Sequence, residues 1–301
     1  MTTPRILLTG KDGQVGFELQ RSLLVLGEIV AVDQAECDLA NPDAIRQLVR
    51  DVAPAIIVNP AAYTAVDKAE SEPELAQAIN GVAPSILGEE AKRLGALVVH
   101  YSTDYVFDGT KAGAYTEYDA PNPQSIYGKT KLAGEKALQA SGADYLIFRT
   151  SWVFGAHGGN FAKTILRLAA ERDVLKIVAD QYGAPTSAAL LADVTAHTLA
   201  RYQLAGMEGR AAFPFGLYHL VADDVTTWHA YAQAVVRAAL AAGKPLKIQP
   251  EAIAPIPTSA YPLPAPRPAN SRLDTSRLQT QFGLRLPPWE EGLKHVLAQL
   301  L

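Results

Sequence analysis

Cysteine, basic stretches and long apolar runs are all scarce in this chain. Its one cysteine, Cys37, cannot form an intrachain disulfide, which is typical of proteins from a reducing compartment. Acidic residues outnumber basic ones by 31 to 27, and no basic stripe of a nucleic-acid-binding protein is visible. No apolar run reaches the ~20 residues that a membrane-spanning helix needs. We therefore expect no nucleic-acid partner and no membrane span.

Metal-ligand spacing and a secretion signal are also missing. The six histidines are scattered without ligand spacing, which favours structural or surface roles for them. The first residues run directly into a strand-like segment, so we expect no signal peptide and a cytoplasmic location. With 301 residues, of which 49% are hydrophobic, the chain can form one large or two modest globular domains.

Short Val- and Ile-rich segments alternate with helical segments over residues 1–150. The predicted strands cover residues 6–8, 28–33, 56–59, 97–101 and 145–148. The predicted helices cover residues 14–26, 43–52, 72–94 and 125–141. Because these strands lack polar alternation, they indicate a parallel sheet buried between helices. The predicted fold class is α/β, a doubly wound, Rossmann-like parallel sheet.

Residues 151–301 lack the regular alternation of strands and helices seen in residues 1–150. We expect a smaller α/β domain here, interleaved with the first, with a helix near 161–172 and a strand near 217–221 that returns to the main sheet. Prolines concentrate in residues 250–268, which predicts an ordered, extended connector. Aromatic residues such as Trp228 and Tyr231 are expected to be mostly packing residues.

A glycine-rich turn follows the first predicted strand. Gly10, Gly13 and Gly16 open the first predicted helix, and glycines there let backbone N–H groups approach a pyrophosphate at the positive helix end. The spacing is G-x-x-G-x-x-G instead of the commoner G-x-G-x-x-G. The alternative is a tight turn with no ligand.

An acidic residue ends the second predicted strand. Asp33 can accept hydrogen bonds from the adenosine ribose of NADH, whereas Lys11 could contribute to binding the 2′-phosphate of NADPH. Asp38 and Leu39 are further candidate contacts near the adenine. Asp33 could also be only a turn residue. The sequence leaves NADH and NADPH both open.

Tyr127 and Lys131 stand four residues apart, on one face of a predicted helix. A cationic ammonium beside a phenol favours the phenolate, so we expect Lys131 to lower the Tyr127 pKa toward the working range. Ser102 and Thr103 follow the fourth predicted strand, at the sheet edge where doubly wound folds bind ligands. A hydroxyl there and Tyr127 can converge on one carbonyl oxygen, which predicts an oxidoreductase.

Together these segments resemble the extended short-chain dehydrogenase/reductase family. Within it, they are most similar to the branch that reduces the C4 ketone of dTDP-4-dehydro-L-rhamnose. The blocks that carry the similarity are 10–16 (GKDGQVG), 59–70 (NPAAYTAVDKAE), 102–107 (STDYVF), 127–135 (YGKTKLAGE), 149–153 (RTSWV), 160–163 (NFAK), 180–186 (DQYGAPT) and 267–274 (RPANSRLD). The resemblance implies a dinucleotide-binding domain over 1–150 and a mostly sugar-nucleotide-binding domain over 151–301.

The resemblance also implies roles for individual residues. Thr103, Tyr127 and Lys131 would form the catalytic triad, with Thr103 and not Ser102 facing the ketone. Backbone contacts and the walls of the cofactor cleft would come from Gln14, Val15, Ala61, Ala62 and Tyr63. The sugar nucleotide would be bounded by Val66, Asp104, Tyr105, Trp152 and Asn160, with Arg267 on its diphosphate.

The implied reaction uses NADPH or NADH to reduce a nucleotide-sugar ketone. Other nucleotide-sugar enzymes of the superfamily, epimerases or 4,6-dehydratases, are the nearest alternative. A non-catalytic, reductase-like regulatory subunit is the alternative from another class. The intact Thr103, Tyr127 and Lys131 set disfavours the regulatory subunit, since a binding module needs no such phenol.

Two departures from the family pattern concern the backbone and a metal. Pro60 follows Asn59 where the family more often has alanine. Some members pair through Mg²⁺ held by glutamates, and Glu18 could serve here. Ala189 and Gln299 stand where the other carboxylates are expected, and a hard cation needs several oxygen ligands. We therefore expect no structural metal, and a monomer or a homodimer formed in another way.

Overall fold

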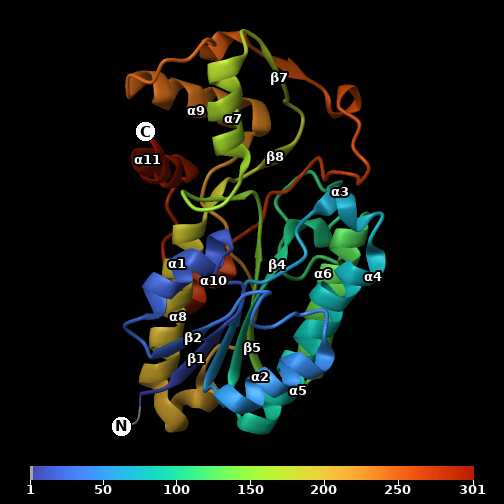
Figure 1. Cartoon of the computed structure of the whole chain (residues 1–301), viewed down its shortest axis with the longest axis vertical. Coiled ribbons are helices and arrows are strands. Elements are labelled where there is room, and N and C mark those ends of the chain that lie inside the picture. Colours follow the sequence, from blue (N-terminus) through green and yellow to red (C-terminus); the bar gives the residue numbers. More distant parts are fainter. Residues whose placement is uncertain (1–2) are drawn as a thin grey trace.

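A six-stranded parallel sheet forms the centre of the protein (Figure 1). The computed structural model describes residues 3–301, and for residues 207 and 208 only the backbone. In spatial order the strands are β10 (Gly216–His219), β5 (Asp144–Thr150), β4 (Leu97–Thr103), β3 (Ile56–Asn59), β1 (Arg5–Leu8) and β2 (Glu28–Ala31). Strand order reverses between β1 and β3, which is where doubly wound sheets bind ligands. The predicted doubly wound α/β fold is confirmed.

Helices cover both faces of this sheet (Figure 1). One face packs against α1 (Gln14–Leu23), α8 (Ala188–Gly209) and α10 (Ser276–Phe282). The other packs against α2 (Pro42–Val52), α5 (Ala83–Leu94) and α6 (Ile126–Ala140). Successive strand residues point to opposite faces, so Ile6 and Leu8 enter the first core and Leu7 the second. This explains why the strands read as continuous apolar runs.

The helix predicted over residues 72–94 is broken in the structure. It follows the short α3 (Val66–Ala69) and consists of α4 (Pro73–Gln77), a π-helical turn η1 (Ala78–Val82) and α5. Pro84 has no N–H to donate to the carbonyl of Asn80, which removes one helical hydrogen bond at this turn. The freed segment lies against α6, where a Cβ on Gly134 would come within 2.1 Å of the Asn80 oxygen.

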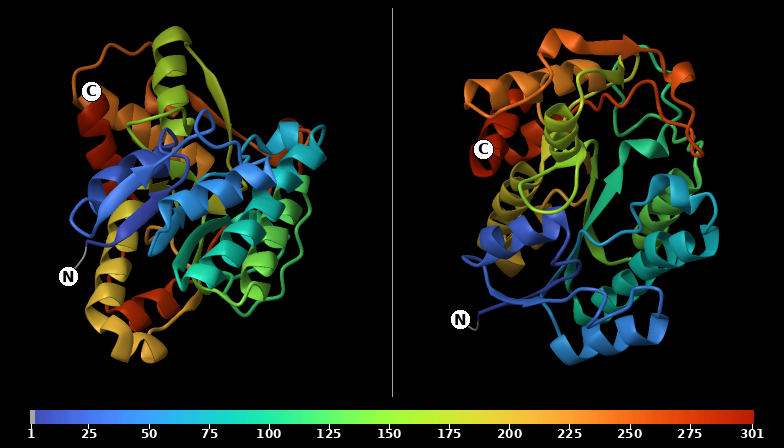
Figure 2. Two further views of the ribbon diagram at one scale, coloured as in Figure 1. Left: turned by 60° about the horizontal axis from the view of Figure 1, so that its bottom comes forward. Right: turned by 45° about the horizontal axis from the view of Figure 1, so that its top comes forward.

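The central sheet and the helices on its two faces form the first layer of the protein. A second layer, built mostly from the second half of the chain, lies above the sheet in Figure 1 and is seen from other sides in Figure 2. Its core joins α7 (Phe161–Glu171), α9 (Trp228–Ala241) and α11 (Trp289–Leu300). Three small two-stranded sheets accompany it: β7 (Leu175–Val178) with β12 (Ile253–Ile256), β8 (Tyr182–Gly183) with β11 (Thr226–Thr227), and β6 (Val153–Phe154) with β9 (Thr186–Ser187). Single helical turns lie at η2 (Asp104–Val106), η3 (Arg210–Ala212), η4 (Pro250–Ala252) and η5 (Thr258–Ala260).

The second half of the chain contributes to both layers. Helices α8 and α10 and strand β10 complete the first layer, with β10 next to β5 at the sheet edge. The proline-rich segment forms η4, β12 and η5 before it returns across the cleft. Within the described part of the chain, no helix is long and apolar enough to cross a membrane.

Candidate active site

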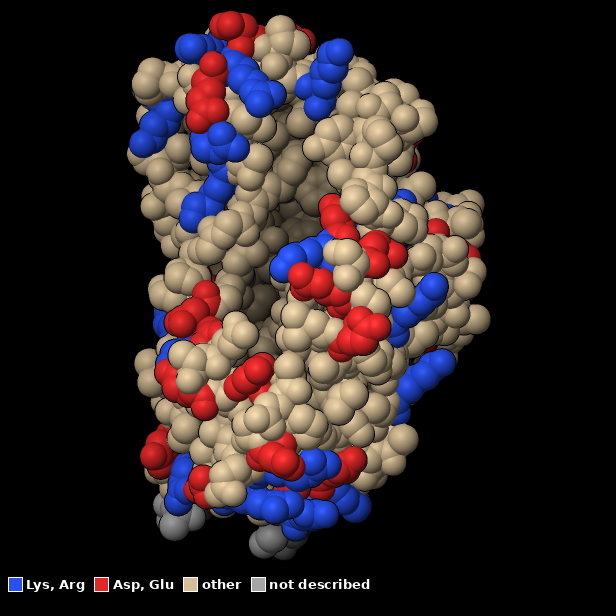
Figure 3. Space-filling model, turned by 45° about the vertical axis from the view of Figure 1, so that its right-hand side comes forward, with Lys and Arg blue, Asp and Glu red and all other residues tan. Residues whose placement is uncertain are grey.

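A cleft lies between the two layers, at the carboxyl ends of the sheet strands (Figure 3). Its central cavity of ≈ 640 Å³ is bounded by the segments that follow β1, β3, β4 and β5. Predicted site residues on its wall are Gly10, Gly13, Gln14, Val15, Gly16, Asp33, Ala61, Ala62, Val66, Thr103, Asp104, Tyr105, Tyr127, Lys131 and Trp152. The fold therefore brings together residues that are far apart in the sequence.

The glycine turn at the start of α1 is shaped for close approach. Gly10 has a φ of +60°, a conformation that favours glycine, and a Cβ on Gly16 would lie 1.9 Å from the Gly10 oxygen. Helix α1 begins at Gln14, so its free N–H groups face the cavity wall that Gln14 and Val15 help to form. Backbone donors at a positive helix end fit the pyrophosphate of a dinucleotide.

The acidic end of β2 lies beside this turn. Asp33 accepts hydrogen bonds from the backbone N–H groups of Asp12 (2.9 Å) and Gln34 (2.6 Å). Lys11 forms an ion pair with Glu36. Glu36 was not among the site residues predicted from the sequence. The pair raises the pKa of Lys11 and lowers that of Glu36. Lys11 is therefore held next to the position where a ribose would meet Asp33.

A neighbouring cavity of ≈ 400 Å³ extends the cleft past Asp33. Asp38, Leu39 and Tyr63 line it, together with Ala61 and Ala62, which it shares with the central cavity. The buried thiol of Cys37 also borders it. This pocket is apolar on the Leu39 side and acidic at Asp33, which suits an adenosine moiety.

Tyr127 and Lys131 lie on the first turns of α6, which Ser125 caps by accepting a hydrogen bond from the Gly128 N–H. Lys131 is only 2% exposed and donates a hydrogen bond of 2.6 Å to the Tyr101 carbonyl. Burial lowers the pKa of Lys131 to about 8, and the charge of Glu135 one turn later opposes that shift.

The pKa of Tyr127 moves in the direction opposite to the one expected from the sequence. Burial raises the pKa of Tyr127 to about 12, and a hydrogen bond with Thr103 only partly offsets the rise. The expectation of a lowered pKa was wrong because the loss of solvent around the phenol dominates, and the negative charge of Asp104 adds to the rise. Tyr127 is therefore a neutral phenol, the form that can donate a proton.

The Ser102–Asp104 segment ends β4 beside Tyr127. The Thr103 hydroxyl donates a hydrogen bond to Asp104 (3.0 Å) and accepts one from the Tyr105 N–H (3.2 Å). The Ser102 hydroxyl is buried without a protein partner. Burial raises the pKa of Asp104 to about 6, with hydrogen bonds from Ser271 and Thr103 opposing the rise. A second protonatable group therefore lies next to the Thr103 and Tyr127 hydroxyls.

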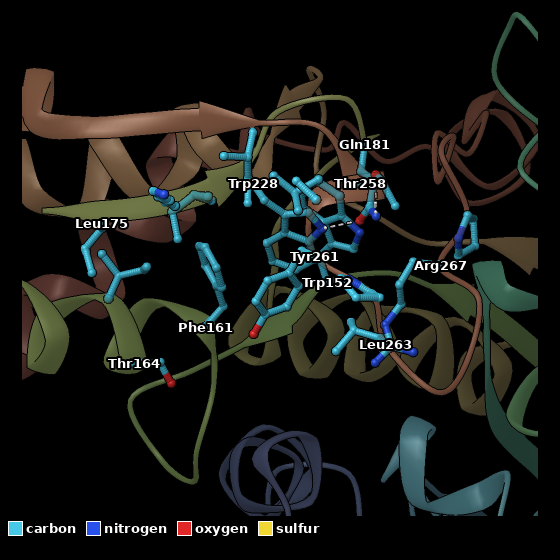
Figure 4. Close-up of a pocket in the computed structure, with 18 of the residues that line it drawn as sticks. Trp152, Phe161, Thr164, Leu175, Gln181, Trp228, Thr258, Tyr261, Leu263 and Arg267 are labelled. Carbon is cyan, nitrogen blue, oxygen red and sulfur yellow. Dashed lines mark hydrogen bonds between the residues drawn. The ribbon is translucent and has the colours of Figure 1, made fainter.

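A larger cavity of ≈ 940 Å³ continues the cleft into the second layer (Figure 4). Tyr105 and Trp152 line both cavities and mark where they meet. The Trp152 ring stacks on Trp228, with centroids 3.7 Å apart, and Trp228 donates a hydrogen bond to Gln181. Trp152 has a φ of +50°, an uncommon conformation for a bulky residue and one that often marks a functional site.

Trp228 corrects one expectation from the sequence. It lines the larger cavity at the start of α9 and is not only a packing residue, whereas Tyr231 on the same helix is fully buried in the second core. Trp228 follows a capping threonine, Thr227, and the sequence gives no other local signal of a site. Its position at the cavity depends on β8 and β11, which pair only in the folded chain.

Two predicted substrate residues make protein contacts in the structure. Asn160 caps α7 and donates hydrogen bonds to Gln14 (3.0 Å) and the Gly155 carbonyl (2.7 Å). Its side chain therefore holds Gln14, the first residue of α1 after the glycine turn. Arg267 lines the larger cavity and forms an ion pair with Asp67 (2.6 Å). Further wall residues that the sequence analysis missed are Thr64, Thr150, Ser151, Gly158 and Gly159.

The glutamate position considered for a metal is engaged elsewhere. Glu18 lies 3.6 Å from Arg21 in an ion pair, and Gln299 bonds to a carbonyl of its own helix. Among the described residues, no group of three or more His, Cys, Asp or Glu side chains is placed to hold a metal ion.

The fold and this site define a dinucleotide-dependent oxidoreductase of the extended short-chain dehydrogenase/reductase superfamily. The chain belongs to the family described as RmlD substrate binding domain, whose model matches residues 4–301. It is 53% identical to the dTDP-4-dehydrorhamnose reductase of Salmonella typhimurium over 299 residues, covering 98% of this chain and 97% of that protein. The Escherichia coli K12 enzyme of the same name is 52% identical, with the same coverage.

A solved structure supports the same assignment. The dTDP-4-dehydrorhamnose reductase of Bacillus anthracis, determined in complex with NADP, has a TM-score of 0.87 and 33% identity, covering 99% of this chain and all of that one. The family resemblance inferred from the sequence is confirmed by these matches.

Proposed function

We propose that this protein reduces the C4 ketone of dTDP-4-dehydro-L-rhamnose to dTDP-L-rhamnose, using NADPH or NADH. The observation that carries the proposal is the group of Tyr127, Thr103 and Lys131 beside the glycine turn in one cleft, with Thr103 and Lys131 almost fully buried. The relatives with 53% and 52% identity carry the name of this reaction. The proposal assigns cofactor binding to residues 1–150 with β10, and most sugar-nucleotide binding to residues 151–301.

The glycine turn and the acidic end of β2 fit a dinucleotide. A side chain on Gly10 would meet Ala61, and one on Gly16 would meet the Gly10 backbone. Glycines therefore keep this turn tight, and a tight turn lets its backbone approach the pyrophosphate at the start of α1. Asp33 would accept from the ribose, and Asp38, Leu39, Ala61, Ala62 and Tyr63 would enclose the adenosine. The hydride that reduces the ketone carbon comes from the nicotinamide of the bound coenzyme.

The residues around Tyr127 supply the proton. Because its pKa lies near 12, Tyr127 keeps its proton at neutral pH and releases it only to a stronger base, such as the alkoxide that forms from the ketone oxygen. Thr103, whose hydroxyl donates to Asp104 in the structure, would turn its proton to that oxygen and hold it next to the phenol. Lys131, as an ammonium, stabilises the phenolate that remains on Tyr127 and binds the ribose of the nicotinamide.

The larger cavity accommodates the remainder of the substrate. Val66, Asp104 and Tyr105 bound the sugar near Tyr127, and the flat Trp152 ring covers its apolar face. Arg267 is placed to exchange its Asp67 partner for the diphosphate, which a guanidinium binds through paired hydrogen bonds. Asn160 acts on the coenzyme side by positioning Gln14.

The test is consumption of reduced coenzyme, followed at 340 nm with enzymatically prepared dTDP-4-dehydro-L-rhamnose. We expect absorbance to fall only when the sugar nucleotide is present. If a folded protein that binds coenzyme shows no such loss, the proposal fails in favour of another sugar nucleotide or a regulatory role. An epimerase or 4,6-dehydratase would instead keep tightly bound NAD⁺ and show no net coenzyme consumption.

A further inference from the structure

A line of buried polar side chains runs beneath the site from Lys131 to the end of β1. The Lys131 Nζ lies 3.4 Å from Nε2 of His100, and Nδ1 of His100 lies 3.1 Å from Nδ2 of Asn59. The Asn59 Oδ1 accepts a hydrogen bond of 2.6 Å from the Thr9 hydroxyl. All four residues are at most 2% exposed.

The sense of these hydrogen bonds depends on the charge of Lys131. As drawn, Thr9 donates to Asn59, and Asn59 donates to His100 Nδ1. A neutral imidazole then carries its proton on Nε2, where only an amine form of Lys131 can accept it. An ammonium requires the reverse: Nε2 accepts, Nδ1–H donates to the Asn59 oxygen, and the Asn59 NH₂ donates to Thr9.

Both senses are available in the same packing. Reversal needs a tautomer change in His100, a half-turn of the Asn59 amide, which exchanges atoms of similar size, and a rotation of the Thr9 hydroxyl. Burial and the charge of Lys131 hold the pKa of His100 well below its usual range, so the imidazole remains neutral throughout. The pKa of Lys131, about 8, makes both of its forms accessible near neutral pH.

We propose that Thr9, Asn59 and His100 are positioning residues that hold Lys131 and reverse their hydrogen bonds whenever Lys131 gains or loses its proton. Each protonation state of Lys131 then has hydrogen-bond partners, and the backbone carbonyl of Tyr101 accepts a hydrogen bond from Lys131 in both states. An apolar pocket in place of this line would leave a buried ammonium with one acceptor fewer than it has here. The inference rests on the proposed function only for the catalytic role of Lys131.

Other charged and titratable groups near this line are few. Glu135 acts on Lys131 through its charge and is itself paired with Arg149. Tyr127 precedes Lys131 by one turn of α6, and the Tyr101 hydroxyl bonds to Thr195 on α8. Burial raises the pKa values of both tyrosines, so neither titrates in the range where Lys131 does.

The direct test is NMR of the full chain without substrate, with ¹⁵N in the histidine rings and ¹³C at the lysine Cε atoms. Ring nitrogen shifts identify the neutral tautomer, and the Cε shift reports the Lys131 charge between pH 6 and 10. His100→Gln and Lys131→Met identify the two signals. If His100→Gln fails to fold, the ring signal that moves in Lys131→Met identifies His100.

We expect the Nδ1–H tautomer of His100 wherever Lys131 is cationic and the Nε2–H tautomer wherever it is an amine. Any pH at which the His100 tautomer does not match the Lys131 charge overturns the proposal. One such result is an Nε2–H tautomer beside a Lys131 that stays cationic over the whole pH range. A tautomer change that persists in Lys131→Met also overturns it. Because no substrate is used, these results are independent of whether the proposed reaction is correct.

A matched pair of variants tests the far end of the line. Thr9→Val removes the last hydroxyl and should move the midpoint of the Lys131 titration, and with it the alkaline limb of the kcat/KM profile. Thr198→Val removes another buried hydroxyl, which bonds a carbonyl within α8, and should leave both unchanged. An unmoved midpoint in a folded Thr9→Val protein contradicts the role of Thr9.

Discussion

Arg267 and Asp67 form an ion pair across the cleft, with Nη2 of the arginine 2.6 Å from Oδ2 of the aspartate. Asp67 belongs to α3, next to the first layer, and Arg267 follows the proline-rich segment of the second half. The same carboxylate accepts from the backbone N–H of Ala265, which fixes the loop that carries Arg267. The pair therefore competes with any anion that enters the larger cavity.

Substitutions of this pair should change sugar-nucleotide affinity in opposite directions. Arg267→Met removes a charge-assisted contact to the diphosphate, and KM for the sugar nucleotide should rise by about 10- to 100-fold. Asp67→Asn frees the arginine, so KM should fall. Initial rates at varied sugar nucleotide check both, with KM for coenzyme as the control. Equal KM values in all three proteins contradict the role of Arg267.

Asp104 should make the protein less stable as the pH rises from about 4 to about 6. Burial raises its pKa from 3.8 to about 6, so in this range the folded state binds more protons than the unfolded state. Asp104→Asn removes this dependence, which amounts to at most about 3 kcal/mol. Urea unfolding at pH 4, 5, 6 and 7.5 should show that the free energy of unfolding of the variant, measured relative to wild type, increases with pH. A constant difference contradicts the burial argument.

Most local features of the fold and site could be predicted from the sequence, whereas several contacts between distant segments could not. Gly10, Gly16, Tyr127 and Lys131 were recognisable because a turn or a helix repeat sets their spacing. Their shared cavity follows from the parallel strand order. The π-turn before Pro84 was missed, although Pro84 is a local signal, because the helical periodicity of residues 72–94 indicates one continuous helix. The close approach of this turn to α6, about fifty residues later, could not be predicted.

Long-range partners explain the other errors. The Tyr127 pKa depends on how deeply the phenol is buried, which spacing alone does not reveal. Trp228 reaches the cleft through the packing of α9 against α7 and the pairing of β8 with β11. His100 lies beneath Lys131 because β4 runs under α6. Glu36 and Lys11 are 25 residues apart and meet only when β1 and β2 pair.

The Lys11–Glu36 pair should influence the choice of coenzyme. Glu36→Gln removes a negative charge beside Asp33 and releases Lys11 to meet a 2′-phosphate. Because the pair is exposed, we expect only about a two- to fivefold fall in KM for NADPH. KM for NADH should hardly change. Initial rates with both coenzymes check this, and an equal change for the two would contradict the placement of the 2′-phosphate.

The buried pair of Arg149 and Glu135 should matter for folding more than any surface pair. Arg149 donates to both carboxylate oxygens, at 2.9 and 2.6 Å, and both side chains are almost fully buried. Arg149→Met leaves an unpaired buried charge and should cost about 3–5 kcal/mol in urea unfolding.

A surface pair provides the control for that substitution. Arg167→Met breaks the exposed pair with Glu171 on α7 and should cost at most about 0.5 kcal/mol. The double variant Glu135→Leu with Arg149→Met should recover part of the loss, since no charge is left buried. Similar losses for Arg149→Met and Arg167→Met would contradict the importance of burial.

The central claim is that Tyr127 donates the proton to the reduced ketone oxygen. The most direct measurement compares wild type and Tyr127→Phe at 340 nm with dTDP-4-dehydro-L-rhamnose, while fluorescence titration follows coenzyme binding. We predict that kcat falls by about 10²- to 10⁴-fold with coenzyme binding unchanged. Near-wild-type turnover by Tyr127→Phe would contradict this account and assign the proton to another group.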